Sequence, residues 1–549
     1  MKYAIPQKIC LGLLLMLLLV RTSVQADPYP IDSNVDVLHY HFALRLFDHT
    51  DRIEGMAKIQ VHFRKAGVHQ LRLDLMTSAV SADQKGMVVD SVRTAARKLG
   101  YQHEQNVLMI FVSTEGRADA TEEVLVYYHG VPADGLHAGK DKFGDRGFFS
   151  DNWPDKTRHW LPTVDHPHEK ATCEFLITAP IHYQVVSNGL IKERTVMNDS
   201  TLFTHWNQSV PISAWLYTLG ISRFAVQELE AYEGKSIQSW VYAKERDAGF
   251  RDFASPTKET LTYFSDYVGP FAYEKIANIE SPVVGGGMEA ASAIGYSEKI
   301  IDGAKSKRIR NVIIHELAHQ WFGNAVTEKT WDDVWLSESF ATYFTLRFIR
   351  HAYGEAEFRD ELKKARSLFE RHLEKEPAYP IVASRSPDTG PVTSYAVTYQ
   401  KGAWVLHMLN ERMGEAAFQK GIREYYQLYF NATASTRDFI SIMQKHSNND
   451  LDRFFKQWLL RPDRISAGIK WNYDSKHKQL LLSLEQDGAE EDAYQFPLIL
   501  EITGDGKTIR KQIDVRSRKG TWSLPLKFRP ALVVPDPEGN LLASFRFTQ

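Results

Sequence analysis

Two histidines near the middle of the chain stand four positions apart in the segment NVIIHELAHQ, residues 311–320. On a helix this spacing puts His315 and His319 one turn apart on one face, where both imidazoles can reach the same metal ion. Glu316 lies beside them and, as a non-ligand, can take a proton from a metal-activated water. The residue types therefore predict hydrolysis of a carbonyl group at a zinc site.

The HExxH string is only moderately specific, because His and Glu also occur together on solvated helix faces that bind nothing. Here the helix is expected to be buried, since the motif is flanked by apolar residues, namely Val312, Ile313, Leu317 and Ala318. Buried His and Glu side chains are costly unless they are paired, and metal binding removes that cost. The apolar flanks therefore favour a metal site over a solvated face.

A third ligand is predicted in the segment WLSESFATYF, where Glu338 comes nineteen residues after His319. The alternative is that Glu338 occupies an exposed position on an amphipathic helix. Its sequence neighbours are aromatic, however, and a carboxylate inside an aromatic helix needs a partner. The neighbouring rings belong to Trp331, Trp335, Phe340, Tyr343 and Phe344. We therefore expect Glu338 to complete the metal site.

The whole stretch HELAHQWFGNAVTEKTWDDVWLSESFATYF, residues 315–344, resembles the gluzincin zinc aminopeptidases. That family includes aminopeptidase N and the leukotriene epoxide hydrolase. The resemblance continues in WLPTVDHPHEKATCEF at 160–175 and in RFFKQWLLRP at 453–462. It implies one Zn²⁺ ion held by His315, His319 and Glu338, with Glu316 as the general base.

A glycine-rich segment precedes the motif, with Gly285, Gly286, Gly287, Met288 and Glu289 in succession. Taken alone, it would be interpreted as a flexible solvated loop. It resembles the family segment whose glutamate binds the free α-amine of the substrate. The resemblance implies Glu289 as the amine anchor, with Gly286, Gly287 and Met288 as substrate-binding neighbours. Glycines let a peptide backbone approach closely, and a carboxylate near zinc fixes an ammonium relative to the scissile bond.

A tyrosine that could assist the reaction lies in TYQKGAWVLHML, residues 398–409. A tyrosine that opens an apolar helix is more often part of a core or an interface. Tyr399 nevertheless resembles the family tyrosine of Y-x-K-G-A, which donates a hydrogen bond to the oxyanion of the tetrahedral intermediate. Tyr395 lies one helical turn away and is the nearest competitor for this role.

The elements that position these residues are expected to form a multidomain α+β fold, because 549 residues exceed what one core usually supports. Ile59, Val61 and Phe63 alternate with polar residues, as in a half-buried strand. Helical periods begin near residue 245, and short strand patterns return after Pro462. We expect a signal peptide at 1–26, an N-terminal antiparallel β domain at 27–228, a thermolysin-like, mainly helical catalytic domain at 229–465 and a C-terminal β-sandwich at 466–549.

The first residues have the pattern of a secretory signal peptide. Lys2 and Lys8 precede an apolar run at 9–20, and Val24 and Ala26 form a small-residue cleavage pattern. A membrane anchor is the alternative, but about 12 apolar residues fall short of the roughly 20 that a spanning helix needs. We expect export to the periplasm or the medium, and no membrane span in the mature chain.

Composition restricts the partners. Lys and Arg total 66 against 68 Asp and Glu, for a formal net charge of -2. This balance gives no general attraction to phosphate backbones, so we expect no nucleic-acid partner.

The expected function is zinc-dependent removal of the N-terminal residue from peptides with a free N-terminus. One alternative is an endopeptidase or epoxide hydrolase on the same scaffold. It is favoured if Ala290, which stands where the family usually has Asn, marks the loss of amine anchoring. A non-catalytic peptide-binding or scaffold protein is an alternative of another class. Such relatives usually lose a ligand or the general base, whereas all four residues are present here.

Overall fold

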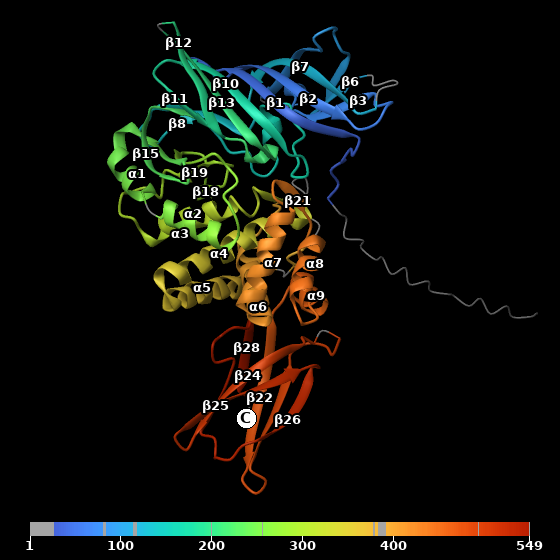
Figure 1. The fold of residues 1–549 in the computed structure, drawn as a ribbon, viewed down its shortest axis with the longest axis vertical. Coiled ribbons are helices and arrows are strands. Elements are labelled where there is room, and N and C mark those ends of the chain that lie inside the picture. The colour runs from blue at the N-terminus through green and yellow to red at the C-terminus, as the bar shows by residue number, and fades with distance from the viewer. Residues whose placement is uncertain are drawn as a thin grey trace, which may run out of the picture.

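The computed structural model describes residues 27–80, 84–112, 118–198, 200–254, 256–376, 379–382, 391–491 and 493–547. The expected signal peptide, residues 1–26, lies outside this range. Three parts follow one another along the molecule: β sheets at the N-terminal end, helices in the middle and a second β part at the C-terminal end (Figure 1). This is the α+β organisation predicted from the sequence.

The first part is built on a seven-stranded sheet of order β12-β13-β10-β1-β2-β7-β4. Strand β1 pairs with β10 in parallel, and the other neighbouring pairs are antiparallel. Ile59, Val61 and Phe63 are fully buried on its inner face, which confirms the predicted alternation. The strands are β1 (Val35–Arg45), β2 (Ile53–Phe63), β4 (Gly86–Arg93), β7 (Ala120–Val131), β10 (Ala171–Pro180), β12 (Leu190–Asn198) and β13 (Thr201–Ile212).

Two smaller sheets complete this part. One has the order β3-β6-β5, with β3 (Gln70–Asp74), β5 (Tyr101–Glu104) and β6 (Val107–Phe111). The other has the order β11-β14-β9-β8, with β8 (Leu136–Lys140), β9 (Arg146–Ser150), β11 (Gln184–Ser187) and β14 (Leu219–Ser222).

A five-stranded mixed sheet, of order β15-β16-β17-β19-β18, joins the first part to the helices. Its strands are β15 (Phe224–Tyr232), β16 (Lys235–Tyr242), β17 (Lys275–Ser281), β18 (Gly287–Met288) and β19 (Ala293–Ser297). The expected domain limit at residue 228 falls inside β15, which pairs with β16. Edge strand β18 carries part of the glycine-rich segment, so this sheet positions one wall of the site.

The helices of the middle part are α1 (Arg246–Phe253), α2 (Thr257–Tyr267), α3 (Lys307–His319), α4 (Trp335–Tyr353), α5 (Glu355–Leu373), α6 (Gly402–Met413), α7 (Glu415–Leu428), α8 (Thr436–His446) and α9 (Asp452–Leu459). A parallel pair of short strands, β20 (Val326–Glu328) and β21 (Ala432–Ala434), ties the α3–α4 connection to the chain before α8. None of the helices in the described ranges combines the length and apolar character needed to cross a bilayer.

Two helical segments differ from what periodicity predicted. The helical period of residues 331–351 predicts a helix from Trp331, but Trp331–Asp333 forms a 3-10 turn and α4 begins at Trp335. The pattern also placed a helix start at Tyr399, whereas residues Tyr395–Lys401 form a π-helical segment, η7, directly before α6. Such wide turns are often found at functional sites, because they redirect side chains that a regular helix would bury.

The C-terminal part is a sandwich of two sheets, of orders β26-β23-β22-β28 and β25-β24-β27. Ile469, Leu482 and Leu498 are buried in its core, which confirms the predicted β unit. The strands are β22 (Ile465–Asp474), β23 (Gln479–Gln486), β24 (Phe496–Gly504), β25 (Lys507–Val515), β26 (Lys519–Pro525), β27 (Leu532–Pro535) and β28 (Ala543–Phe547). It lies at the end of the molecule opposite the N-terminal sheets (Figure 1).

Candidate active site

Helix α3 holds the two predicted histidine ligands. Ser306 caps its first turn, since the Ser306 hydroxyl accepts a hydrogen bond from the backbone N–H of Ile309 at 3.4 Å. Ile309, Ile313 and Leu317 recur every four residues and are buried, which fixes the rotation of the helix. As a result, the Nε2 atoms of His315 and His319 lie 3.2 Å apart.

Helix α4 brings the third predicted ligand to this pair. Phe340 and Phe344 pack against Phe322, which follows α3, and so dock the two helices together. Glu338 Oε2 lies 3.6 Å from Nε2 of His315 and 3.3 Å from Nε2 of His319.

These separations match a zinc site. Bonds of roughly 2.0–2.1 Å to a tetrahedral zinc ion hold neighbouring ligand atoms about 3.3 Å apart. The three facing atoms of His315, His319 and Glu338 therefore have the spacing of three zinc ligands, as the sequence predicted.

The charge of the cluster also fits a cation. Glu289, Glu316 and Glu338 are all buried around the two imidazoles. Glu338 Oε2 and Glu289 Oε1 have no hydrogen-bond donor among the described residues. Burial, with Glu289 next in effect, raises the pKa of Glu316 well above its usual value. Because buried unpaired anions are costly, the cluster fits one Zn²⁺ ion.

The orientation of His319 is fixed by contacts of its Nδ1 atom, on the side of the ring away from the other zinc donors. Its Nδ1 lies 3.1 Å from the carbonyl oxygen of Phe322 and 3.0 Å from the hydroxyl of Ser337. A carbonyl oxygen can only accept, so Nδ1 carries the proton and Nε2 keeps its lone pair for the metal. Sequence reasoning missed Phe322, because a backbone carbonyl leaves no signal in side-chain types, and it missed Ser337, because that contact depends on how α4 packs against α3.

The predicted general base, Glu316, is packed against the glycine-rich segment. A Cβ atom at Gly287 would lie 2.2 Å from Glu316 Oε1, so a larger residue cannot stand there unless the carboxylate moves. Glycine at 287 is therefore required by the close approach of the backbone to the base.

Replacing Gly287 with alanine is expected to lower kcat by about 100-fold, because displacing a catalytic group by about 1 Å costs on that order. Zinc content should stay unchanged, since the ligands are not touched. Gly285→Ala is the matched control, because a Cβ there meets nothing within 4 Å. Steady-state kinetics on both variants checks this; equal losses would contradict the steric role of Gly287.

The predicted amine anchor, Glu289, is held rigidly rather than in a flexible loop. Strand β18 pairs with β19, and the carbonyl oxygen of Glu289 accepts hydrogen bonds from Gln320 at 3.1 Å and Asn324 at 2.6 Å. Glu289 Oε1 lies 3.9 Å from Nε2 of His319. Sequence reasoning missed Gln320 and Asn324, although both fall within the HQWFGN run. They hold the chain at this point, where Ala290 is buried.

Tyr399 bonds to one of the zinc donors, whereas Tyr395 lines the same cleft but is largely exposed. The Tyr399 hydroxyl donates to Glu338 Oε1 at 2.5 Å, and its ring stacks on His315 at 5.9 Å. Burial, with Glu338 next in effect, raises the pKa of Tyr399, so the phenol stays protonated as a hydrogen-bond donor. Tyr395 is 63% exposed. The two rings lie on the π-helical segment η7 with their centroids 5.5 Å apart, so they remain in contact although they differ in exposure.

One cleft of about 720 Å³ connects these groups. Its lining includes Gly286, Gly287 and Glu289 together with the zinc donors, Glu316 and Tyr399. Met288, predicted to bind substrate with them, does not line the cleft, and its side chain is buried in the core. Successive residues of a strand face opposite sides, so Gly287 faces Glu316 while Met288 turns away.

Two domains of one protein family match the chain. Residues 37–216 match the Peptidase M1 N-terminal domain, and residues 254–458 match the Peptidase family M1 domain. Together these matches cover more than half of the sequence, and the second includes the HExxH helix, Glu338 and Tyr399.

Curated relatives carry aminopeptidase names. Glutamyl aminopeptidase of Sus scrofa is 30% identical over 412 residues, covering 71% of this chain and 42% of the relative. Probable aminopeptidase 2 of Sulfurisphaera tokodaii is 27% identical over 453 residues, covering 77% of this chain and 55% of the relative. The chain thus spans about half the length of these relatives.

A solved structure has a similar fold. The M1 zinc metallopeptidase from Deinococcus radiodurans superposes with a TM-score of 0.66 at 22% identity, covering 78% of this chain and 94% of that one. The fold, the two domain matches and the donor set agree with one another. The chain therefore belongs to peptidase family M1, the gluzincin family that its HExxH stretch resembles.

Proposed function

We propose that this chain is a zinc-dependent aminopeptidase that removes the N-terminal residue from peptides. The observation that carries this proposal is the carboxylate of Glu289, which is buried in the cleft beside the zinc donors. Its Oε1 has no hydrogen-bond donor among the residues that the structure describes. Such a carboxylate is suited to a cation of the substrate, and the free α-amine of a peptide supplies one.

Each side chain then has a defined part in the reaction. His315, His319 and Glu338 would hold the zinc ion, which would supply Lewis-acid polarisation of the attacking water and the scissile carbonyl. Glu316 accepts the proton of the water and passes it to the leaving amine. The Tyr399 hydroxyl turns from Glu338 to donate a hydrogen bond to the oxyanion. Glu289 holds the α-ammonium, which fixes the first peptide bond over the zinc site.

Substituting Glu289 tests the proposed substrate class. Glu289→Gln is expected to lower kcat/KM for free-amine substrates by about 10-fold to 100-fold, since a hydrogen bond to a charged group contributes about 1.5–3 kcal/mol. Glu361→Gln, which removes another carboxylate lining the same cleft, should leave kcat/KM nearly unchanged. If wild type cleaves acetylated peptides as fast as free ones, an endopeptidase replaces the proposal.

Removing the Tyr399 hydroxyl tests the oxyanion role. Tyr399→Phe is expected to lower kcat by about 100-fold to 1000-fold with little change in KM, as for other donors that act in the transition state. Tyr395→Phe is the control, because Tyr395 lines the same cleft but is largely exposed. The Tyr399→Phe variant should keep its zinc. A kcat near that of wild type would contradict the role of Tyr399 as the oxyanion donor.

We also propose that the protein is exported, on the strength of Lys2, Lys8 and the apolar run at 9–20. The mature chain should begin at Asp27. N-terminal sequencing of the protein from its native host checks this, and an intact Met1 on cytoplasmic protein would contradict it.

A further inference from the structure

The outward face of the seven-stranded sheet, away from the zinc cleft, carries a second group of metal-binding side chains. His39 and His41 alternate along β1, and Glu174 lies opposite His41 on the neighbouring parallel strand β10. One ligand atom from each residue lies within 4.8 Å of the others. We propose that these three side chains hold a divalent transition metal of the Zn²⁺ or Cu²⁺ class.

The distance between His41 and Glu174 is compatible with two ligands of one metal ion. His41 Nδ1 lies 3.2 Å from Glu174 Oε2, close to the separation of about 3.3 Å between ligands of one tetrahedral ion. Hydrogen-bonded histidine–carboxylate pairs elsewhere in the described chain reach similar distances, 2.7 Å for His446 with Glu424 and 3.2 Å for His62 with Asp119. The feature that distinguishes this group is therefore its third donor, His39.

Hydrogen bonds to neighbouring residues fix the tautomer of His39, the first proposed ligand. The Thr172 hydroxyl donates to the carbonyl oxygen of Leu38 at 3.1 Å, so it accepts from His39 Nδ1 at 2.7 Å. His39 therefore carries its proton on Nδ1 and keeps a lone pair on Nε2. Metal-binding histidines are held in this way, with one nitrogen donating to the protein and the other facing the ion.

The carboxylate is held from the opposite side. Asn207 donates to Glu174 Oε1 at 2.9 Å, and His205 Nε2 lies 3.2 Å from Oε2. These two contacts fix the position of the oxygen that faces His41.

The donor types and the neighbouring charges restrict which metal the three side chains can hold. Lys58, opposite His41 on β2, has its ammonium 3.5 Å from Glu123, which partly offsets its charge. Two imidazoles and one carboxylate suit Zn²⁺ and Cu²⁺ better than Mg²⁺ or Ca²⁺.

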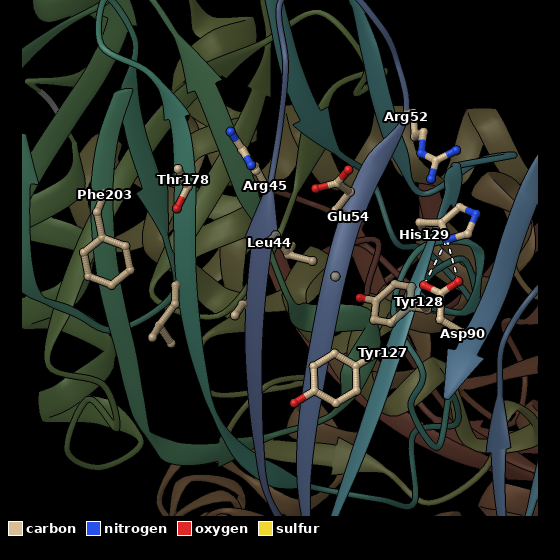
Figure 2. Close-up of a pocket in the computed structure, with 13 residues that line it drawn as sticks. Leu44, Arg45, Arg52, Glu54, Asp90, Tyr127, Tyr128, His129, Thr178 and Phe203 are labelled. Carbon is tan, nitrogen blue, oxygen red and sulfur yellow. Dashed lines mark hydrogen bonds and ion pairs between the residues drawn. The ribbon is translucent and has the colours of Figure 1, made fainter. Parts of the chain in front are cut away.

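The same sheet face supplies a matched control. Figure 2 shows His129 paired with Asp90 at the edge of a shallow hollow, among side chains such as Arg45, Thr178 and Phe203 that stand on the face carrying His41. This histidine–carboxylate pair is part of no three-donor group among the described residues. A variant at His129 therefore removes a surface histidine without touching the proposed site.

Metal stoichiometry on the full chain tests the proposal. After dialysis against excess Zn²⁺ and then metal-free buffer, wild type should retain two zinc ions per chain by elemental analysis. The double variant His39→Asn/His41→Asn should retain one, and His129→Asn should retain two. A chain with Glu338→Ala should also retain one ion, and zinc should raise its Tm, because a ligand that binds the native state stabilises it.

Two results would overturn this inference. One is a wild type that retains a single zinc ion, in which case His41, Glu174 and His205 form only a hydrogen-bonded network. The other is equal loss of metal from the His129→Asn variant, which would show nonspecific binding to surface histidines. Neither result bears on the zinc site of α3 and α4, so failure here is distinguishable from failure of the proposed aminopeptidase function.

Discussion

Replacing Glu316 with glutamine is expected to lower kcat by about 1000-fold while the chain keeps its zinc ion. Glutamine has nearly the same shape as glutamate but cannot accept a proton from the attacking water. Glu316 also lies in a three-donor group with Glu289 and His319, but the proposed ion is held by His315, His319 and Glu338, so metal content should not change. The kcat, normalised by active-site titration, and the zinc content, determined by elemental analysis, are measured on the same sample.

The close packing of Gly287 against Glu316 makes the Glu316→Gln variant easier to interpret. Because the backbone at Gly287 confines the Glu316 carboxylate, glutamine must occupy the same position, and a loss of rate reports chemistry rather than displacement. A Glu316→Gln enzyme with normal kcat would remove Glu316 from the role of general base. Loss of zinc from this variant would instead make Glu316 a ligand.

Replacing Glu338 with alanine is expected to weaken zinc binding by more than about 100-fold. Outer-shell partners of metal ligands already contribute 10-fold to 100-fold, and Glu338 is a direct ligand in this account. His315 and His319 would remain as a two-nitrogen site with no carboxylate. Competition with a fluorescent chelator measures the affinity, and activity should fall with zinc occupancy.

Tyr399→Phe is the control for this variant. It removes the hydroxyl that bonds to Glu338 Oε1 but leaves all three donor atoms in place. Zinc affinity should therefore fall by no more than the roughly 10-fold to 100-fold that outer-shell partners contribute, which is less than the loss in Glu338→Ala. If Glu338→Ala holds zinc as tightly as Tyr399→Phe does, Glu338 is not a ligand.

Local patterns predicted the part of the site that lies on regular helices. His315 and His319 follow from helical spacing, and the apolar flanks predicted the burial that the structure shows. Glu338 required the additional assumption that the next helix packs against the first. That assumption is confirmed by the contacts of Phe322 with Phe340 and Phe344.

The contacts that pairwise patterns could not predict depend on the path of the backbone. Gln320 and Asn324 hold the carbonyl oxygen of Glu289, and no rule of spacing connects residues 289 and 324. Met288 turned into the core because β18 pairs with β19 and sets the alternation. Tyr399 reached Glu338 through a π-helical segment, where periodicity predicted only a regular helix start.

The proposed metal site on the outward sheet face also depends on contacts between residues that are far apart in the sequence. The alternation around His39 and His41 is visible in the sequence, but their partner Glu174 is 133 residues from His41. Only the parallel pairing of β1 with β10 places these residues together. Long-range strand pairing is fixed by the packing of the whole domain rather than by local residue types.

The most direct test of the central claim is the release of a fluorescent amine from aminoacyl substrates, each supplied with a free and with an acetylated N-terminus. The assay is run on the purified chain, after chelation, and again after zinc is restored. We expect cleavage of the free-amine substrates only, lost on chelation and recovered with zinc. Cleavage of acetylated substrates at the same rate, or activity that survives removal of zinc, would contradict a zinc aminopeptidase.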